Sequence, residues 1–339
     1  MHTWFKRAAI AAIGAIALWI GVALALVAAP APAFRSTPFP IAARGTPTCS
    51  RSPDTACYTA RDGTVLHALR EGAPSDTIVL LLHGVMSDAD AMRPAAIALH
   101  AKTGATVLSL DLRGHGTSGG AFGDIAYPGQ YEDDVADVVA TLREEAPRAR
   151  VLLAGHSMGG GIAVRYAARA AVPAVDGYLL YAPHLGEHAP TTRHDAAAAA
   201  GAEVPIKLSL QRTIGLLMLG AVGMHGLDGL GTLYFNVSRG DGPMHYSFRA
   251  MTGCAPDDYA AALRADDAPL LIVAGGADEA FDASGYPAAA RLHANGEALV
   301  VDGVGHDGIL TDTAALDAID RWLRTRVGRS APAAGRFTP

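Results

Sequence analysis

The sequence predicts an α/β fold with a mostly parallel, doubly wound sheet, an inserted helical lid and an N-terminal transmembrane helix. Short continuous apolar runs alternate with amphipathic helical segments over most of the chain, and such runs are typical of strands that helices cover on both faces. Alternation of this kind favours right-handed crossovers, with the ligand site beyond the carboxyl ends of the strands.

Residues 1–30 are predicted to be a membrane anchor. Lys6 and Arg7 precede the apolar run Ala8–Ala29, which contains no charged residue. About 20 residues cross a bilayer, whereas a cleavable signal has a shorter apolar region of about 7–15 residues. Positive charge tends to stay cytoplasmic, so we expect an extracytoplasmic main domain. Ala31-Pro32-Ala33 resembles a cleavage site, so secretion after signal cleavage is the alternative.

The remaining chain divides into a linker, one large domain and a tail. Residues 31–56 are rich in proline without periodicity, which predicts a semi-rigid linker. The α/β domain is expected over residues 57–327, and residues 328–339 are expected to be disordered. Cys49 and Cys57 bracket a short loop and are candidates for a disulfide or for two free thiols, while Cys254 is interpreted as a small buried residue.

The predicted strands of the sheet are continuous apolar runs. An Asp-Gly turn at Asp62-Gly63 also predicts a hairpin ahead of them. The runs are Ile78–Leu82, Ala105–Leu110, Val151–Ala154, Tyr178–Tyr181, Leu270–Ala274 and Ala298–Val301. Helical spacing of apolar residues predicts helices over Tyr131–Glu145 and Leu316–Val327.

The stretch from 184 to 265 interrupts the alternation of strands and helices. It is far longer than an ordinary connection of about 2–6 residues plus a helix, so we interpret it as a lid insertion. Within it, Ile214–Val222 is apolar on all sides and too short to span a bilayer. We expect a helix over the site entrance that offers an acyl-binding wall; a buried core helix is the alternative.

The strongest chemical motif is G-x-S-x-G at residues 155–159, directly after a predicted strand and before a predicted helix. A sharp strand-to-helix turn strains its central residue and exposes the hydroxyl, and bulkier residues at the two glycine positions would collide with neighbouring elements. Ser157 is therefore the predicted nucleophile. The amide of Met158 lies at a helix N-terminus, where it can stabilise a developing oxyanion.

A serine nucleophile needs a base and a group that orients the base. His306 follows the last predicted strand in a glycine-containing loop and is the predicted general base. Asp278 follows the preceding strand and is the predicted orienting acid, which gives the chain order Ser, Asp, His. Glu279 and Asp282 are rivals for that role in the same loop.

The second donor of the oxyanion hole is expected after the first long apolar run. His83-Gly84 ends that run, and the amide of Val85 can then lie beside that of Met158. His83 itself is interpreted as a structural residue that holds the loop.

These motifs (HGVMS, DLRGHGTSGG, GHSMGGG, GGADEAF and GVGHDG) resemble the α/β-hydrolase superfamily. The resemblance runs from about Cys57 to Val327 and is nearest to the lysophospholipase- or monoacylglycerol-lipase-like branch, also called serine aminopeptidase-like. It implies an α/β-hydrolase fold and a triad of Ser157, Asp278 and His306. Arg113 lies in a turn that shapes a loop in that family. The short oxyanion loop, the unassigned insertion and the N-terminal anchor depart from the family pattern.

The sequence therefore predicts hydrolysis of carboxylic esters through an acyl-serine, with a lipidic or hydrophobic ester as substrate. A net charge of −6 without a cluster of basic residues argues against a nucleic-acid partner. No cofactor and no metal are expected. The alternatives are an acyltransferase on the same triad, a catalytically silent binding protein on this fold, and a metal enzyme that uses His184, His188 and His194. The oligomeric state is left open.

Overall fold

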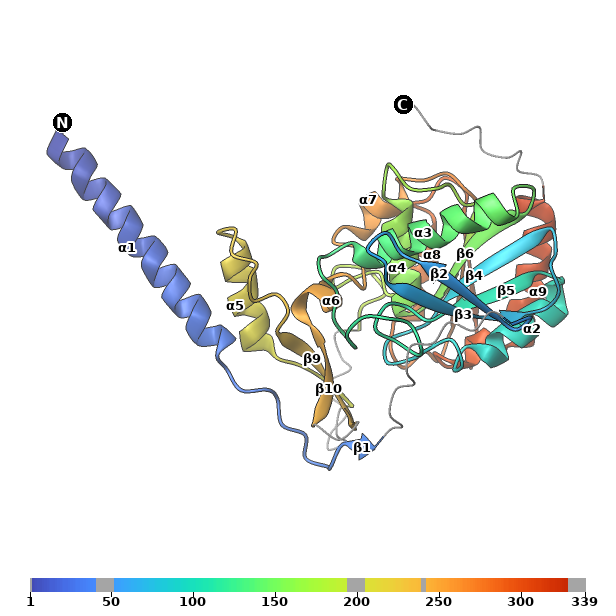
Figure 1. Cartoon of the computed structure of the whole chain (residues 1–339), viewed down its shortest axis with the longest axis horizontal. Helices are drawn as coiled ribbons and strands as arrows, with labels where there is room; N and C mark the ends of the chain where they lie inside the picture. The colour runs from blue at the N-terminus through green and yellow to red at the C-terminus, as the bar shows by residue number, and fades with distance from the viewer. Residues whose placement is uncertain (1, 41–51, 194–204, 239–241, 329–339) are drawn as a thin grey trace. The chain divides into compact units, whose positions relative to one another are not determined.

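The structure is a computed structural model that describes residues 2–40, 52–193, 205–238 and 242–328. The chain divides into two compact units. The small unit comprises residues 1–43, 123–126 and 199–251, and the large unit comprises residues 44–122, 127–198 and 252–339. Both are coloured along the chain in Figure 1.

The large unit contains a sheet of eight strands in the order β12-β11-β7-β6-β4-β5-β3-β2. The six strands from β12 to β5 are parallel, and β3 runs antiparallel to both β5 and β2. This order is that of a mixed, mostly parallel α/β-hydrolase sheet, which confirms the predicted fold class. The strands are β2 (Thr55–Thr59), β3 (Val65–Glu71), β4 (Thr77–Leu82), β5 (Thr106–Leu110), β6 (Arg150–His156), β7 (Gly177–Tyr181), β11 (Leu270–Gly275) and β12 (Gly296–Val301).

Helices cover this sheet and complete its core. Residues Leu316, Ile319 and Trp322 of α9 pack with strand residues such as Val79 and Val273 in one buried cluster, to which α2 also contributes. Burial of strand side chains on both faces explains their continuous apolar sequences. The helices are α2 (Arg93–Thr103), α3 (Gln130–Glu145), α4 (Met158–Ala167), α7 (Tyr259–Leu263), α8 (Tyr286–Ala290) and α9 (Thr313–Trp322), with single turns η2 (Ala283–Gly285) and η3 (Gly308–Leu310) and a π-turn η4 (Leu323–Val327).

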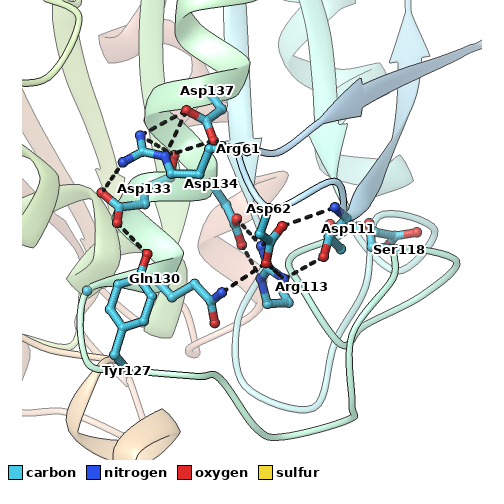
Figure 2. A network of polar contacts seen from close by, with 12 residues as sticks. Arg61, Asp62, Asp111, Arg113, Ser118, Tyr127, Gln130, Asp133, Asp134 and Asp137 are labelled. Carbon is cyan, nitrogen blue, oxygen red and sulfur yellow. Dashed lines mark hydrogen bonds and ion pairs between the residues drawn. The ribbon is translucent and has the colours of Figure 1, made fainter.

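A polar network ties the hairpin of β2 and β3 to α3 and to the loop after β5 (Figure 2). The guanidinium of Arg113, almost fully buried, bonds to Asp134 at 2.5 Å and to Asp62 at 2.8 Å. Arg61 makes a similar ion pair with Asp137. Burial raises the pKa of Asp134 to about 6, and the ion pair with Arg113 offsets only part of that cost. Arg113 therefore fixes a loop of the large unit.

The small unit holds the N-terminal helix and most of the insertion. Its elements are α1 (His2–Val27), β1 (Phe39–Pro40), β8 (Ile206–Leu208), α5 (Leu210–Gly220), β9 (Gly231–Ser238) and β10 (Pro243–Ser247). Strands β8 and β10 pair antiparallel with β9, and β1 pairs parallel with it. This sheet was not anticipated, because β9 is buried without a strict alternation of exposed and buried residues. The short helix α6 (Phe248–Thr252) belongs to the small unit except for its last residue, from which the chain continues into the large unit.

Helix α1 is long and apolar enough over Trp4–Val27 to cross a membrane, judged by length and composition alone. A signal sequence meets the same criterion, so this helix is consistent with either an anchor or a signal. Among the described cysteines, Cys254 is a buried free thiol and Cys57 lies in β2. Cys57 is disulfide-bonded. Cys49 lies outside the described residues, as does the end of the tail, so its pairing with Cys57 and the disorder of the tail stay predictions.

Candidate active site

Ser157 lies at the turn between β6 and α4 with φ 52° and ψ −112°, a region that non-glycine residues rarely adopt. Its backbone holds the turn in place. The amide of Ser157 donates to the carbonyl of Tyr181 at 3.0 Å, and its carbonyl accepts from the amides of Gly161 and His184. The strain at this residue is therefore balanced by three backbone hydrogen bonds.

The two motif glycines are required by close backbone contacts. A Cβ at Gly155 would lie 2.3 Å from the carbonyl carbon of Gly159, and a Cβ at Gly159 would lie 2.5 Å from the carbonyl oxygen of Leu82. No L side chain fits at such distances. The G-x-S-x-G spacing thus allows α4 to start directly against the ends of β4 and β6.

The loop after β4 lies beside this turn. A Cβ at Gly84 would come 3.4 Å from the Cβ of Ser157, so the backbone that leads into Val85 passes next to the candidate nucleophile. Met158 occupies the first position of α4, where backbone amides have no partner within the helix. The two amides that the sequence analysis selected therefore belong to segments that meet at Ser157.

Two buried side chains fix the loop that contains Val85. His83 donates from Nδ1 to the carbonyl of Gly84 at 2.8 Å and accepts at Nε2 from the amide of Leu112 at 3.1 Å. Burial lowers the pKa of His83, which matches a neutral ring with one donor and one acceptor. Asp111 accepts from the amide of Ala89 at 2.7 Å and so joins the same loop to the turn after β5.

His306 lies in the loop after β12, and its Nδ1 lies 2.8 Å from Oδ2 of Asp278. The other oxygen of Asp278 accepts from the amides of Ala280 and Phe281 at 2.8 and 2.9 Å. The Asp278 side chain is fully buried. Burial alone would raise its pKa, but the hydrogen bonds from His306 and the two amides outweigh burial and leave the pKa lowered.

The rivals of Asp278 occupy other positions in its loop. Glu279 accepts from the backbone amide of His306 at 3.0 Å and does not bond to the ring. Asp282 caps the turn η2 by accepting from Ser284. Asp278 is therefore the carboxylate that contacts the imidazole of His306, whereas Glu279 binds the backbone amide of the same residue.

Two further contacts of His306 were missed by the sequence analysis. The Nε2 of His156 donates to the carbonyl of His306 at 3.2 Å, and the two rings pack with centroids 4.6 Å apart. Phe281 meets the His306 ring edge to face at 5.3 Å. His156 directly precedes Ser157, so these contacts bring the loop after β12 to the turn after β6. The sequence feature that could have indicated these contacts is His156, the histidine inside the G-x-S-x-G motif.

The buried His156 predicts an acid-dependent loss of stability. Burial, with help from the neighbouring His306, lowers the pKa of His156 from near 6.5 to about 4. Between these two pH values the unfolded chain binds more protons, so the free energy of unfolding falls as pH drops from 6.5 to 4. The lowered pKa corresponds to ~3 kcal/mol. We expect urea titrations to show that the free energy of unfolding of wild type falls by ~3 kcal/mol more between pH 7 and pH 4 than that of His156→Gln. Equal losses would contradict this prediction, because all other titrating groups are shared.

A cavity of about 570 Å³ lies beside Asp278. Its lining includes Asp278, Phe281 and Arg193 but neither Ser157 nor His306. We therefore do not assign it to the reacting substrate.

The described residues include one group of three possible metal ligands, formed by His156, His306 and Asp307 with ligand atoms within 4.8 Å of one another. It overlaps the candidate base, whose Nδ1 already bonds to Asp278. Of the histidines considered as ligands from the sequence, His184 is half-buried and stacks on Phe281, His188 is exposed, and His194 lies outside the described residues.

The sheet order, the strained serine turn and the histidine–aspartate pair define the class of protein. The chain has the α/β-hydrolase fold, and residues 73–217, somewhat less than half of the chain, match the family model described as serine aminopeptidase, S33. A monoacylglycerol lipase from Mycolicibacterium smegmatis is 35% identical over 92 residues, which are 27% of this chain and 32% of that protein. Alignments with the first curated relatives cover about a third or less of those proteins.

Solved structures agree with this fold. A bacterial membrane phospholipase A superposes with a TM-score of 0.56 at 19% identity, covering 81% of this chain and 87% of that one. An esterase from Rhodococcus sp. ECU1013 superposes with a TM-score of 0.55 at 19% identity, covering 80% and 99%.

Proposed function

We propose that this chain is a serine hydrolase that cleaves carboxylic esters through an acyl intermediate on Ser157. The observation that supports this most directly is the placement of His306. Asp278 binds its Nδ1 at 2.8 Å, while its ring packs on His156, the residue next to the serine. Such a histidine presents Nε2 as a base, because its other nitrogen must carry the proton shared with the carboxylate.

The proposed reaction has two halves. His306 takes the proton of Ser157 as Oγ attacks the ester carbonyl carbon, and the amides of Val85 and Met158 bind the oxygen of the tetrahedral intermediate. The intermediate collapses when His306 gives its proton to the leaving alcohol, which leaves the acyl group on Ser157. His306 then deprotonates a water molecule that attacks the acyl carbonyl carbon, and it returns this proton to Oγ of Ser157 as the C–Oγ bond breaks and the acid is released. Asp278 stabilises the imidazolium in both halves and stays ionised, in accord with its lowered pKa.

We propose a lipidic or otherwise hydrophobic acyl ester as the substrate class. Two features of the chain support it, besides its similarity to a monoacylglycerol lipase and to a membrane phospholipase A. The insertion contains the apolar helix α5, and the chain begins with an apolar helix consistent with a membrane anchor. We further propose that the large unit lies on the extracytoplasmic side, because Lys6 and Arg7 precede the apolar run.

A series of p-nitrophenyl esters from acetate to palmitate tests the ester chemistry and the acyl preference together. Each methylene that is buried on binding contributes about 0.8 kcal/mol, so two of them already favour the longer ester about tenfold in kcat/KM. We expect octanoate or decanoate to exceed acetate by at least that factor. A preference for acetate would exclude a hydrophobic acyl substrate, and the absence of hydrolysis across the series would contradict the ester activity.

A further inference from the structure

The end of α1 is packed into the small unit. Ala23 and Val27 are buried in one cluster with Leu216 and Leu219 of α5 and with Phe248. In Figure 1 the two helices lie side by side at this end of α1. The rest of α1 is mostly exposed, and its exposed side chains include Ile10, Ile13 and Ile16. The last two turns of α1 are therefore part of the core of the small unit.

The backbones of the two helices approach each other closely at Gly215. A Cβ there would lie 2.6 Å from the carbonyl oxygen of Ala23 and 2.9 Å from the amide nitrogen of Val27. Close backbone contact at a small residue is the usual way in which helices pack inside a membrane.

Side chains from both helices donate hydrogen bonds to backbone carbonyls across this contact. Arg212 donates from Nε to the carbonyl of Val27 at 3.1 Å and from the guanidinium to the carbonyl of Ala29 at 2.6 Å. The carbonyl of Val27 belongs to the negative end of the α1 dipole, which a cation stabilises, and that of Ala29 lies in the turn just after the helix. The indole of Trp19 donates to the carbonyl of Met218 at 2.8 Å. Removal of α1 would leave Arg212 and the apolar cluster without these partners.

The pattern of contacts gives the direction of α5. Gly215 lies against Ala23 and Val27, whereas Met218, further along α5, lies against Trp19, further back along α1. The helices are therefore antiparallel, and α5 extends from the end of α1 toward its middle. At 1.5 Å per residue, the five residues from 215 to 220 extend about 8 Å in that direction. Hence a bilayer that contains α1 must also surround the second half of α5.

The exposed surface of α5 and of the turn after it suits a lipid environment. Residues 214–224, IGLLMLGAVGM, contain no charged or hydrogen-bonding side chain. Leu217 is 57% exposed, and Ile214, Val222 and Met224 are also exposed. The charged residue Arg212 lies before this stretch, level with the end of α1. Polarity therefore falls along α5 toward the middle of α1, as expected for a segment that enters a membrane from its surface.

We propose that α5 and the turn after it are inserted into the lipid leaflet beside α1, so that the small unit is a membrane-embedded module of two antiparallel helices. The occupant of the exposed apolar surface is lipid hydrocarbon. An insertion depth of about 5–10 Å is typical of helices that lie at the membrane interface and agrees with the length of α5 beyond Gly215. The proposal also requires that α1 is retained in the mature chain. The proposal does not depend on the ester chemistry.

The test places single reporter cysteines on the full-length chain in phosphatidylcholine nanodiscs with one chain per disc. Leu217→Cys and Val222→Cys are exposed sites on the proposed surface, and each is labelled with a nitrobenzoxadiazole fluorophore. Ile13→Cys on α1 is the control for the hydrocarbon, and Ile97→Cys, 48% exposed on α2 of the large unit, is the control for water. Nitroxide lipids quench a label in the bilayer, and iodide quenches a label in water.

We expect lipid quenching at both test sites within about twofold of Ile13→Cys, and iodide quenching at least about fivefold weaker than at Ile97→Cys. Iodide quenching equal to that of Ile97→Cys would overturn the proposal. Shielding that appears only when several chains share a disc would assign the surface to a second copy of the chain and would also overturn it. Terminal sequencing should find α1 in the membrane-extracted protein; a chain that starts after Ala33 would contradict the proposal.

Discussion

Ser157→Ala is expected to abolish ester turnover, lowering kcat by on the order of 10⁴- to 10⁶-fold. The alanine has no oxygen to form the acyl intermediate, and a water molecule in its place would not be held for attack. The oxyanion amides of Val85 and Met158 would remain, so a residual activity about 10³-fold above the uncatalysed rate is expected. The measurement is p-nitrophenyl ester hydrolysis, together with labelling by a fluorophosphonate probe, which reacts with an activated serine.

The same substitution should leave the fold intact. The turn is held by backbone bonds from Ser157 to Tyr181, Gly161 and His184, all of which alanine retains. Alanine adopts the strained φ of 52° at a cost similar to that of serine, since both carry a Cβ. We therefore expect the free energy of unfolding to change by less than about 1 kcal/mol.

Ser284→Ala is the matched control for this experiment. Ser284 lies in η2 of the same unit and bonds to Asp282, away from His306. Its loss should leave turnover and probe labelling within about twofold of wild type, as is usual for a substitution outside the reacting groups. Wild-type turnover in Ser157→Ala, or labelling that persists in it, would place the nucleophile elsewhere in the chain.

The sheet and its serine turn could be predicted from the sequence because their signals are local. Burial on both faces produces continuous apolar strands, and the turn requires glycine on either side of the serine because the backbones around Gly155 and Gly159 touch. The candidate base and acid followed from the same reasoning, since parallel strands end at one edge of the sheet.

The contacts that orient His306 could not be predicted in this way. His156 and His306 are 150 positions apart, and nothing in either segment encodes that one will donate to the other's carbonyl. Likewise, Glu279 is adjacent to Asp278 in the sequence, and only the path of the loop decides which carboxylate meets the ring and which meets the backbone. The packing of α1 on α5 is also a long-range contact, between segments that each appear merely apolar in the sequence.

Asp278→Asn should lower kcat by about 10⁴-fold while the fold is retained. The reason lies in the two backbone amides of Ala280 and Phe281, which donate to Oδ1 of Asp278. They require an oxygen at that position, so an asparagine must direct its NH₂ group at Nδ1 of His306. That nitrogen would then have to accept, and its proton would move to Nε2. The tautomer that results cannot take the proton from Ser157.

Glu279→Gln is the comparison that separates the two carboxylates. The amide oxygen of glutamine can still accept from the backbone N–H of His306, which Glu279 binds at 3.0 Å. We therefore expect a loss of less than about tenfold in kcat, since a neutral acceptor replaces a charged one but the bond remains. Thermal melts of both variants establish that the chain is folded. If Glu279→Gln lost more activity than Asp278→Asn, the orienting acid would be Glu279, and the loop would have to rearrange during the reaction to bring that side chain to the imidazole.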